Sequence, residues 1–209
     1  MIFAIAAAMF CSCDKNADCV PCEETKENGT LAISLLFDET TPTKAVTAYT
    51  TSQTYEKQVN RVQLFIFDED GKVNIYKDAG TTQSNIAIST TTGKKTVWAV
   101  VNGPDLSTVA SLTELEDIAV DLAANSTTAA TGFVMAGSTS CTVSATNTTA
   151  NVTVSRLVAR VALQKVVNQL PEGYGTITIN NVVLCNVVGN QNLAGDAPAA
   201  TWYNKMGRK

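Results

Sequence analysis

The stretch that decides the fold is GTLAISLLF at residues 29–37. Its large apolar side chains recur at every second position, at Leu31, Ile33, Leu35 and Phe37. Successive side chains of an extended chain point to opposite faces, so this alternation predicts a β-strand with a strongly apolar inner face. Because the first apolar segment of the domain has this pattern, we expect the core to be built from strands.

Similar patterns recur along the chain. The hairpin signal Asp-Glu-Asp-Gly at 68–71 joins two apolar runs, and the turn Gly-Lys-Lys at 93–95 joins two more. A change of parity near Ser155 and Arg156 predicts a β-bulge within the longest run. Trp98 is expected in the core. The predicted strands after the first one cover residues 59–67, 72–76, 86–88, 96–102, 141–146, 151–167 and 176–188.

One helix interrupts the strands. Ser111-Leu-Thr-Glu114 has the spacing of a capping box, in which the serine hydroxyl and the glutamate carboxylate satisfy free backbone amides. The apolar residues up to Leu122 follow helical spacing. The pattern as a whole predicts a mainly β domain, an antiparallel β-sandwich or barrel-like fold with one or two short helices. No internal repeat is present.

The composition narrows the function. The chain has 209 residues, 45% of them hydrophobic and 16% charged, with a net charge of −4. It has no clustered basic residues, which argues against nucleic acid as a partner. It has no histidine, which removes Ser-His-Asp and Cys-His catalysis and every histidine-ligated metal site. We therefore predict no enzyme, no catalytic residue, no metal site and no cofactor.

The N-terminus has the features of an export signal. Residues 1–12 are apolar and too short to span a bilayer, as in the apolar region of a secretory signal. A small residue, Ser12, precedes Cys13, as in a bacterial lipoprotein signal. Cys13 is therefore the predicted lipidation site, and residues 13–28 are a predicted polar tether. The alternative is a buried N-terminal helix with incidental cysteines.

The other cysteines suggest structural roles. Cys19-Val-Pro-Cys22 has the spacing of a redox pair, but its polar flanks lack the helix start that a redox pair needs. We therefore expect Cys19 and Cys22 to form an adventitious disulfide or to remain two exposed thiols, and not to act as a redox pair. Cys141 and Cys185 lie in apolar runs and are expected to be buried free thiols.

The order of these segments resembles one family. Thr43-Lys44-Ala45 follows the first strand. Five further motifs come next: VNRVQLFIFDEDG at 59–71, TVWAVVN at 96–102, LTELE at 112–116, MAG at 135–137 and VSRLVARV at 154–161. This order, over residues 13–190, resembles the N-terminal domain of the type V pilus fimbrillins, the FimA-like and Mfa-like major fimbrial subunits. The resemblance implies a transthyretin-like β domain over residues 29–190.

The resemblance also implies a mechanism. Such precursors are exported as acylated (palmitate-bearing) lipoproteins to the outer membrane, and a trypsin-like protease cuts the loop after the first strand. Loss of that strand leaves a groove that a strand of the next subunit fills by donor-strand exchange. Here the released strand would contain Leu31 to Phe37. The cut would fall within the long polar loop 38–56, between Lys44 and Ala45, although the family commonly has Arg at the cut.

Residues 191–209 are expected to be the start of a missing or truncated C-terminal domain, so the chain is expected to accept a strand but not to donate one. The predicted function is a structural subunit of a surface fimbria that partners other fimbrial subunits, the outer membrane and a processing protease. The alternative is a lipid-anchored surface module that binds a glycan or a host protein without polymerising.

Overall fold

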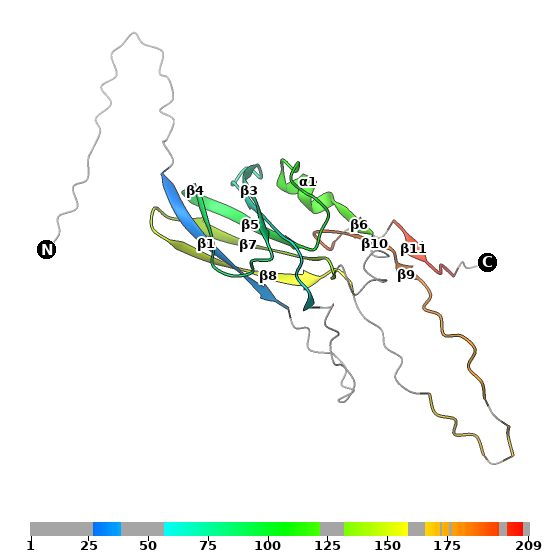
Figure 1. The fold of residues 1–209 in the computed structure, drawn as a ribbon. Coiled ribbons are helices and arrows are strands. Elements are labelled where there is room, and N and C mark those ends of the chain that lie inside the picture. The colour runs from blue at the N-terminus through cyan, green and yellow to red at the C-terminus, as the bar shows by residue number, and fades with distance from the viewer. Residues whose placement is uncertain are drawn as a thin grey trace, which may run out of the picture.

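Figure 1 shows the computed structural model of the chain, which describes residues 27–38, 57–121, 132–158, 166–171, 173–175, 177–196 and 200–206. One short helix, α1 (Leu112–Asp117), accompanies the strands. The main sheet contains β1 (Asn28–Phe37), β2 (Val62–Phe67), β3 (Val73–Gly80), β4 (Ile86–Thr91), β5 (Gly93–Val101), β7 (Met135–Val143) and β8 (Thr148–Arg156). Two small sheets pair β6 (Ala119–Asp121) with β10 (Asn190–Asn192) and β9 (Val187–Val188) with β11 (Trp202–Tyr203).

The main sheet curls into a nearly closed barrel. Its strand order is β3-β2-β5-β7-β8-β1-β4, and the edge strands β3 and β4 come together. Lys77 of β3 donates from Nζ to the carbonyl of Ala87 at 3.0 Å, and the Thr90 hydroxyl donates to Asn74 Oδ1 at 2.6 Å. These contacts give hydrogen-bond partners to polar groups at the two edges of the sheet, which have no neighbouring strand on their outer side. The prediction of a mainly β, barrel-like domain is confirmed.

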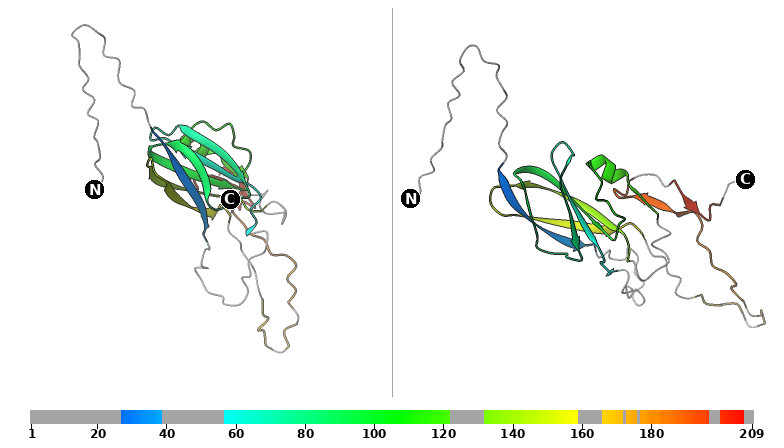
Figure 2. Two further views of the ribbon diagram at one scale, coloured as in Figure 1. Left: turned by 60° about the vertical axis from the view of Figure 1, so that its left-hand side comes forward. Right: turned by 45° about the horizontal axis from the view of Figure 1, so that its top comes forward.

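One strand pairing differs from the predicted antiparallel arrangement. Every neighbouring pair in the main sheet is antiparallel except β1 and β8, which run in the same direction. Figure 2 shows β1, in blue, along one side of the barrel, where its two neighbours in the sheet are β8 and β4. The first strand therefore joins β8 to β4 within the sheet although it lies far from both in the sequence.

The core is divided between the two faces of the sheet. All six residues of β2 are buried, because apolar clusters lie on both of its sides. The cluster inside the barrel contains Leu31, Ile33, Leu64 and Val97 among others. The outer cluster contains Phe65, Phe67, Trp98 and Leu115, where α1 and the loop after β5 cover the sheet. The predicted core position of Trp98 is confirmed.

The helix begins where the sequence predicts and ends early. Ser111 is its N-cap, and the Glu114 amide donates to the Ser111 hydroxyl at 3.2 Å. Ile118 is already extended, and its carbonyl accepts from Leu193 at 3.0 Å. Pairing of β6 with β10 thus replaces the helix that the sequence predicts to continue towards residue 122.

Several predicted strand and turn boundaries are wrong in part; the predicted strand 141–146, for example, starts earlier, at Met135, and ends at Val143. β8 ends at Arg156, so the predicted strand to residue 167 stops early, although residues 159–165 lie outside the described residues. The pairing of Ser155 and Arg156 with β7 shows no register shift, so the predicted bulge is not found there. Residues 177–185 form no strand, and only Val187–Val188 pairs with another strand. The predicted turn at 93–95 is wrong, because Gly93, Lys94 and Lys95 all belong to β5, and Thr92 alone separates β4 from β5. Within the described part of the chain, no helix is long and apolar enough to cross a membrane.

Candidate functional site

The candidate site is the position that β1 occupies in the barrel. β1 has a neighbour on each side: Leu31 is aligned with Ile88 of β4 and with Thr148 of β8, and Ile33 is aligned with Ile86 and Ala150. If β1 left, both neighbouring strands would expose a row of backbone N–H and C=O groups. Such groups are costly to leave without partners when they are buried.

Three side chains anchor β1 in the core. Leu31 and Ile33 are completely buried, and Leu35 is 7% exposed. Phe37 is half-buried and packs against the same cluster. Burying a leucine or isoleucine side chain stabilises the fold by about 1.5–3 kcal/mol, so β1 contributes substantially to the barrel. The sequence correctly assigned these four side chains to the inner face of the strand.

Specific contacts hold both ends of the strand. At the start, the Thr92 amide donates to the carbonyl of Glu27 at 2.7 Å. At the end, the Asp38 amide donates to the carbonyl of Val154 at 3.1 Å, and Arg156 Nη1 donates to the carbonyl of Asp38 at 3.3 Å. The predicted processing loop starts at this last contact. Lys44 and Ala45, like Cys13, Cys19 and Cys22, lie outside the described residues.

A glycine fixes the register of the strand at its start. A Cβ atom placed on Gly29 would lie 2.1 Å from the carbonyl oxygen of Ser144 and 2.9 Å from Cγ1 of Val143. No real side chain tolerates such a distance to a backbone atom. Any strand that fills this position with the same register therefore needs glycine at the place of Gly29.

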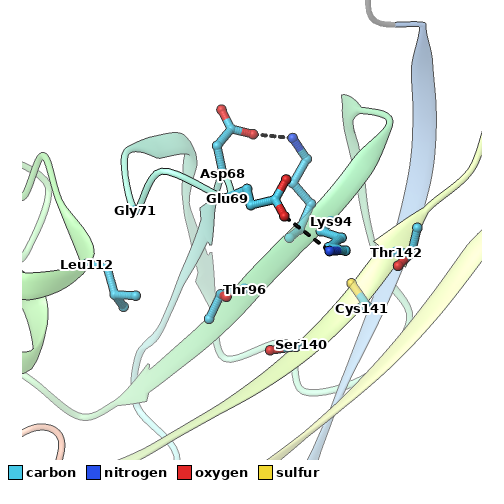
Figure 3. Close-up of a pocket in the computed structure, with 10 residues that line it drawn as sticks. Asp68, Glu69, Gly71, Lys94, Thr96, Leu112, Ser140, Cys141 and Thr142 are labelled. Carbon is cyan, nitrogen blue, oxygen red and sulfur yellow. Dashed lines mark hydrogen bonds and ion pairs between the residues drawn. The ribbon is translucent and has the colours of Figure 1, made fainter.

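A surface cavity of about 350 Å³ lies beside the β2–β3 turn (Figure 3). Lys95, whose side chain is almost fully buried, donates from Nζ to the carboxylate of Asp68 and to Thr91 Oγ1, the latter at 2.7 Å. Lys94 pairs with Glu69 at 3.2 Å at the rim. These four charged groups neutralise one another in pairs, which fits a structural role better than a catalytic one.

The thiol in this cavity is not activated. Burial raises the pKa of the Cys141 thiol, and the nearby Lys95 ammonium only opposes that increase. A raised pKa keeps the thiol protonated, whereas a nucleophilic cysteine needs a lowered one. Cys141 is only half-buried and Cys185 is exposed, so the prediction of buried thiols holds in part for Cys141 and is wrong for Cys185.

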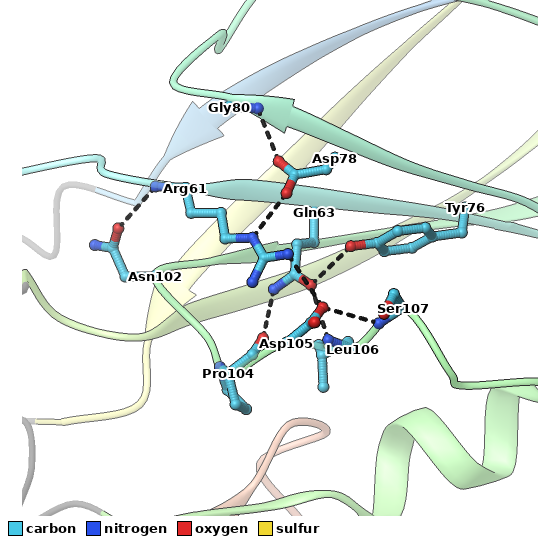
Figure 4. Close-up of polar contacts among 10 residues, drawn as sticks. All are labelled: Arg61, Gln63, Tyr76, Asp78, Gly80, Asn102, Pro104, Asp105, Leu106 and Ser107. Atoms are coloured by element: carbon cyan, nitrogen blue, oxygen red, sulfur yellow. Dashed lines mark hydrogen bonds and ion pairs between the residues drawn. The ribbon is translucent and has the colours of Figure 1, made fainter.

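A polar network joins β2 and β3 to the loop after β5 (Figure 4). Gln63 is completely buried; its Nε2 donates to the carbonyl of Pro104 at 2.6 Å, and its Oε1 accepts from the Leu106 amide at 2.9 Å and from the Tyr76 hydroxyl at 3.0 Å. Arg61 bridges Asp78 and Asp105 at 2.8 and 3.1 Å. The network fixes the loop that covers the outer cluster.

Charge and hydrogen bonding shift the pKa values in this network. The pKa of Asp78 is lowered, first because the Gly80 amide donates to it and then because of Arg61. The pKa of Asp105 is lowered by the Ser107 amide and then by Arg61. Both carboxylates therefore remain ionised near neutral pH and accept the hydrogen bonds that hold the loop.

Sequence reasoning missed Gln63 and Lys95, although a signal existed for both. Gln63 has the parity of Phe65 and Phe67, and Lys95 has the parity of Val97 and Ala99, so each is a polar residue on an apolar face. A buried polar side chain needs a partner, so such a position predicts a buried contact. The glycine requirement at residue 29 has no comparable signal, because it depends on the approach of Ser144.

Comparison with known proteins gives the family. Residues 29–191 match the profile of the family described as "Major fimbrial subunit protein (FimA)". No curated protein matches the chain in sequence. The match starts at the first residue of the predicted first strand and ends within β10.

Solved structures support the fold. A candidate cell adhesion protein from Parabacteroides distasonis is 19% identical over 85% of this chain and 54% of its own, with a TM-score of 0.56. A fimbrial assembly protein from the same organism is 14% identical over 85% of this chain and 71% of its own, with a TM-score of 0.51. Against three structures of candidate adhesion proteins, the chain spans 40%, 54% and 45% of their length.

The similarity to these structures concerns the fold alone, because the identities are low. The family match covers most of the chain and includes every strand of the barrel except the first residue of β1. The chain belongs to the family of major fimbrial subunit proteins (FimA), a family of structural subunits of fimbriae.

Proposed function

We propose that the chain is a structural subunit of a type V pilus that assembles by exchange of its first strand. Family membership supports a fimbrial role at the cell surface and assembly with other fimbrial subunits. In the proposal, removal of β1 opens a slot between β8 and β4, and a strand of another subunit fills it. The observation that carries the proposal is the insertion of β1 between two strands that are not its own hairpin partners.

The geometry of β1 supports exchange of this strand in particular. β1 has no short connection to either of its neighbours, because β4 and β8 lie far along the chain. A cut after residue 38 would therefore leave β1 held by hydrogen bonds and side-chain burial alone. A replacement strand that restores both would gain the same backbone pairing, which is the basis of β-strand addition.

Processing and anchoring complete the proposal. Lys44 is the only basic residue between Asp38 and Lys57, so a trypsin-like protease would cut between Lys44 and Ala45. Before the cut, an acyl chain on Cys13 would hold the precursor at the outer membrane through the polar tether. The cut would separate this anchor from the barrel together with β1, so that maturation releases the subunit as it activates it.

The test is limited trypsin treatment of the full chain, followed by mass spectrometry and an unboiled SDS gel. A cut after Lys44, loss of the peptide that contains β1 and, when other fimbrial subunits are present to donate a strand, a ladder of detergent-resistant species are expected. The Lys44→Gln variant should remain uncut in this loop and monomeric. An uncut or cut monomer that keeps β1 would contradict the proposal and favour a surface module that binds its target without polymerising.

A further inference from the structure

Strand β4 depends on β1 for its backbone pairing. In the described part of the chain, β1 is the one strand that pairs with β4, through the aligned residues Asn28–Ile33 and Ile86–Thr91. A single residue, Thr92, connects β4 to β5. Once β1 leaves, β4 therefore has no hydrogen-bonded neighbour among the described strands, and a strand of this length is not stable by itself.

Burial alone would hold β4 only loosely. Ile86 and Ile88 are 5% and 6% exposed and belong to the cluster inside the barrel. Their aligned partners are Ile33 and Leu31 of β1, so the departure of β1 removes these packing partners as well. Apolar attraction is also non-directional, so it keeps a strand near the core without fixing its position. A fixed β4 needs contacts in which β1 takes no part.

Side-chain hydrogen bonds supply such contacts at the end of β4. The Thr90 hydroxyl donates to Oδ1 of Asn74 in β3 at 2.6 Å, and Thr90 is only 2% exposed. The Thr91 hydroxyl accepts from Nζ of Lys95 in β5 at 2.7 Å and from Nδ2 of Asn74 at 3.4 Å. We call these bonds, together with the bond from Lys77 to the carbonyl of Ala87, the β4 seam. The seam joins β4 to both β3 and β5.

The partners of β4 in the seam are themselves fixed without β1. The carboxylate of Asp68, in the turn between β2 and β3, accepts from Lys95 Nζ and from Asn74 Nδ2, the latter at 3.2 Å. Moving the buried Lys95 away from this carboxylate would leave its charge unpaired, which is costly. Further along β4, Lys77 of β3 donates from Nζ to the carbonyl of Ala87 at 3.0 Å. None of these atoms belongs to β1.

We infer that the β4 seam holds β4 in place after β1 leaves, so that one half of the slot is already formed when another strand arrives. The inference rests on the proposed function, because the slot exists only without β1. The register divides the slot, since Asn28–Ile33 pair with β4 and Leu31–Phe37 pair with β8. The β4 amides that faced β1 would lose their partners, but the strand would keep its position. Thr90 and Asn74 are then positioning residues, which act on an entering strand through the position of β4.

The test measures how fast a strand enters the slot. A site-specific protease sequence replaces residues 42–47 of the full chain, so that cleavage is confined to this loop. After cleavage and release of β1, the association and dissociation rates of an immobilised synthetic peptide of residues 27–38 are measured by interferometry. Thr90→Val should bind the peptide roughly tenfold more slowly than the wild type, because β4 must first find its position, and such a step lowers the association rate. The dissociation rate should change less, because the bound peptide itself holds β4.

Lys77→Met, which changes a solvent-accessible side chain, should slow association in the same direction because it removes the donor to Ala87. Tyr76→Phe is the matched control: it also removes one hydroxyl hydrogen bond, that from Tyr76 to Gln63, but this bond does not involve β4. Its association rate should equal that of the wild type.

Two results would overturn the role of the seam while leaving strand exchange intact. One is equal association rates for the wild type, Thr90→Val and Lys77→Met, and the other is an equal loss of rate in Tyr76→Phe. Global unfolding of the wild-type barrel once β1 is released would overturn it as well. Retention of β1 after cleavage of the wild type would instead contradict the proposed function itself, and this inference with it.

Discussion

The α-carbon of Gly29 faces the carbonyl oxygen of Ser144 so closely that a Cβ atom would lie 2.1 Å from it. This contact fixes where β1 starts relative to the chain that leads from β7 into β8. Because residue 29 has no side chain, β1 can lie in this register beside the turn between β7 and β8. We expect Gly29→Ala to strain this contact and to destabilise the fold by about 1–3 kcal/mol, the usual range for overpacking.

Chemical denaturation of the uncut chain measures this effect as a change in the unfolding midpoint. Gly175→Ala is the control, because a methyl group at that position meets no atom within 4 Å. The control should unfold at the wild-type midpoint. A Gly29→Ala protein as stable as the wild type would mean that the backbone near Ser144 moves aside easily, and the register argument would fail.

The buried Lys95 depends on one carboxylate. Its side chain is 1% exposed and contacts Asp68, whereas Lys94 and Glu69 are about three-quarters exposed. Asp68→Asn leaves a buried ammonium without its counterion, a change that typically costs about 3–5 kcal/mol. Glu69→Gln breaks an exposed pair and should cost less than about 1 kcal/mol. Thermal unfolding of both variants checks the contrast, and similar costs for the two would contradict the burial argument.

Gln63 is expected to be the most sensitive residue of the polar network. Gln63→Leu would leave the Leu106 amide and the Pro104 carbonyl without their partner, and a buried unsatisfied group costs about 1–3 kcal/mol. Tyr76→Phe removes a single bond to Gln63 and should cost less. The measurement is the free energy of unfolding of each variant. A Tyr76→Phe protein less stable than Gln63→Leu would contradict the assignment.

The strand pattern was predictable, whereas the strand neighbours were not. The alternation at Leu31 and Ile33 predicts which face of β1 is buried. It carries no information about which strand lies beside β1, so the parallel pairing with β8 could not be predicted. The capping box at Ser111 gave the start of the helix. Its end depends on Leu193, far along the chain, which explains why local spacing predicted too long a helix.

The run at 177–185 shows the opposite failure. Its composition strongly favours a strand, and the prediction was wrong because no neighbouring strand of the described structure pairs with it. Strand propensity reflects packing against a partner more than a preference of the backbone. An apolar strand pattern therefore does not by itself produce a strand where no partner lies beside it.

The Asp78 and Asp105 carboxylates predict an acid-side loss of stability. Their pKa values are lower in the folded chain than the unfolded value of about 3.9. Such a group stabilises the fold above its unfolded pKa, and the contribution is lost as the pH falls through the folded pKa. Both groups are substantially exposed, so the effect should be small. Denaturation midpoints between pH 6 and pH 2 should fall less steeply for Asp105→Asn than for the wild type.

The central claim is that β1 can leave and be replaced, and hydrogen exchange tests it most directly. Mass spectrometry would follow amide protection in β4 and β8 in the uncut chain, directly after cleavage in the 39–56 segment, and after assembly. Protection along Ile86–Thr91 and Thr148–Val154 should be high, then lost with the departure of β1, and then restored in multimers. Protection that stays constant through all three stages would contradict the account, because the slot would never have opened.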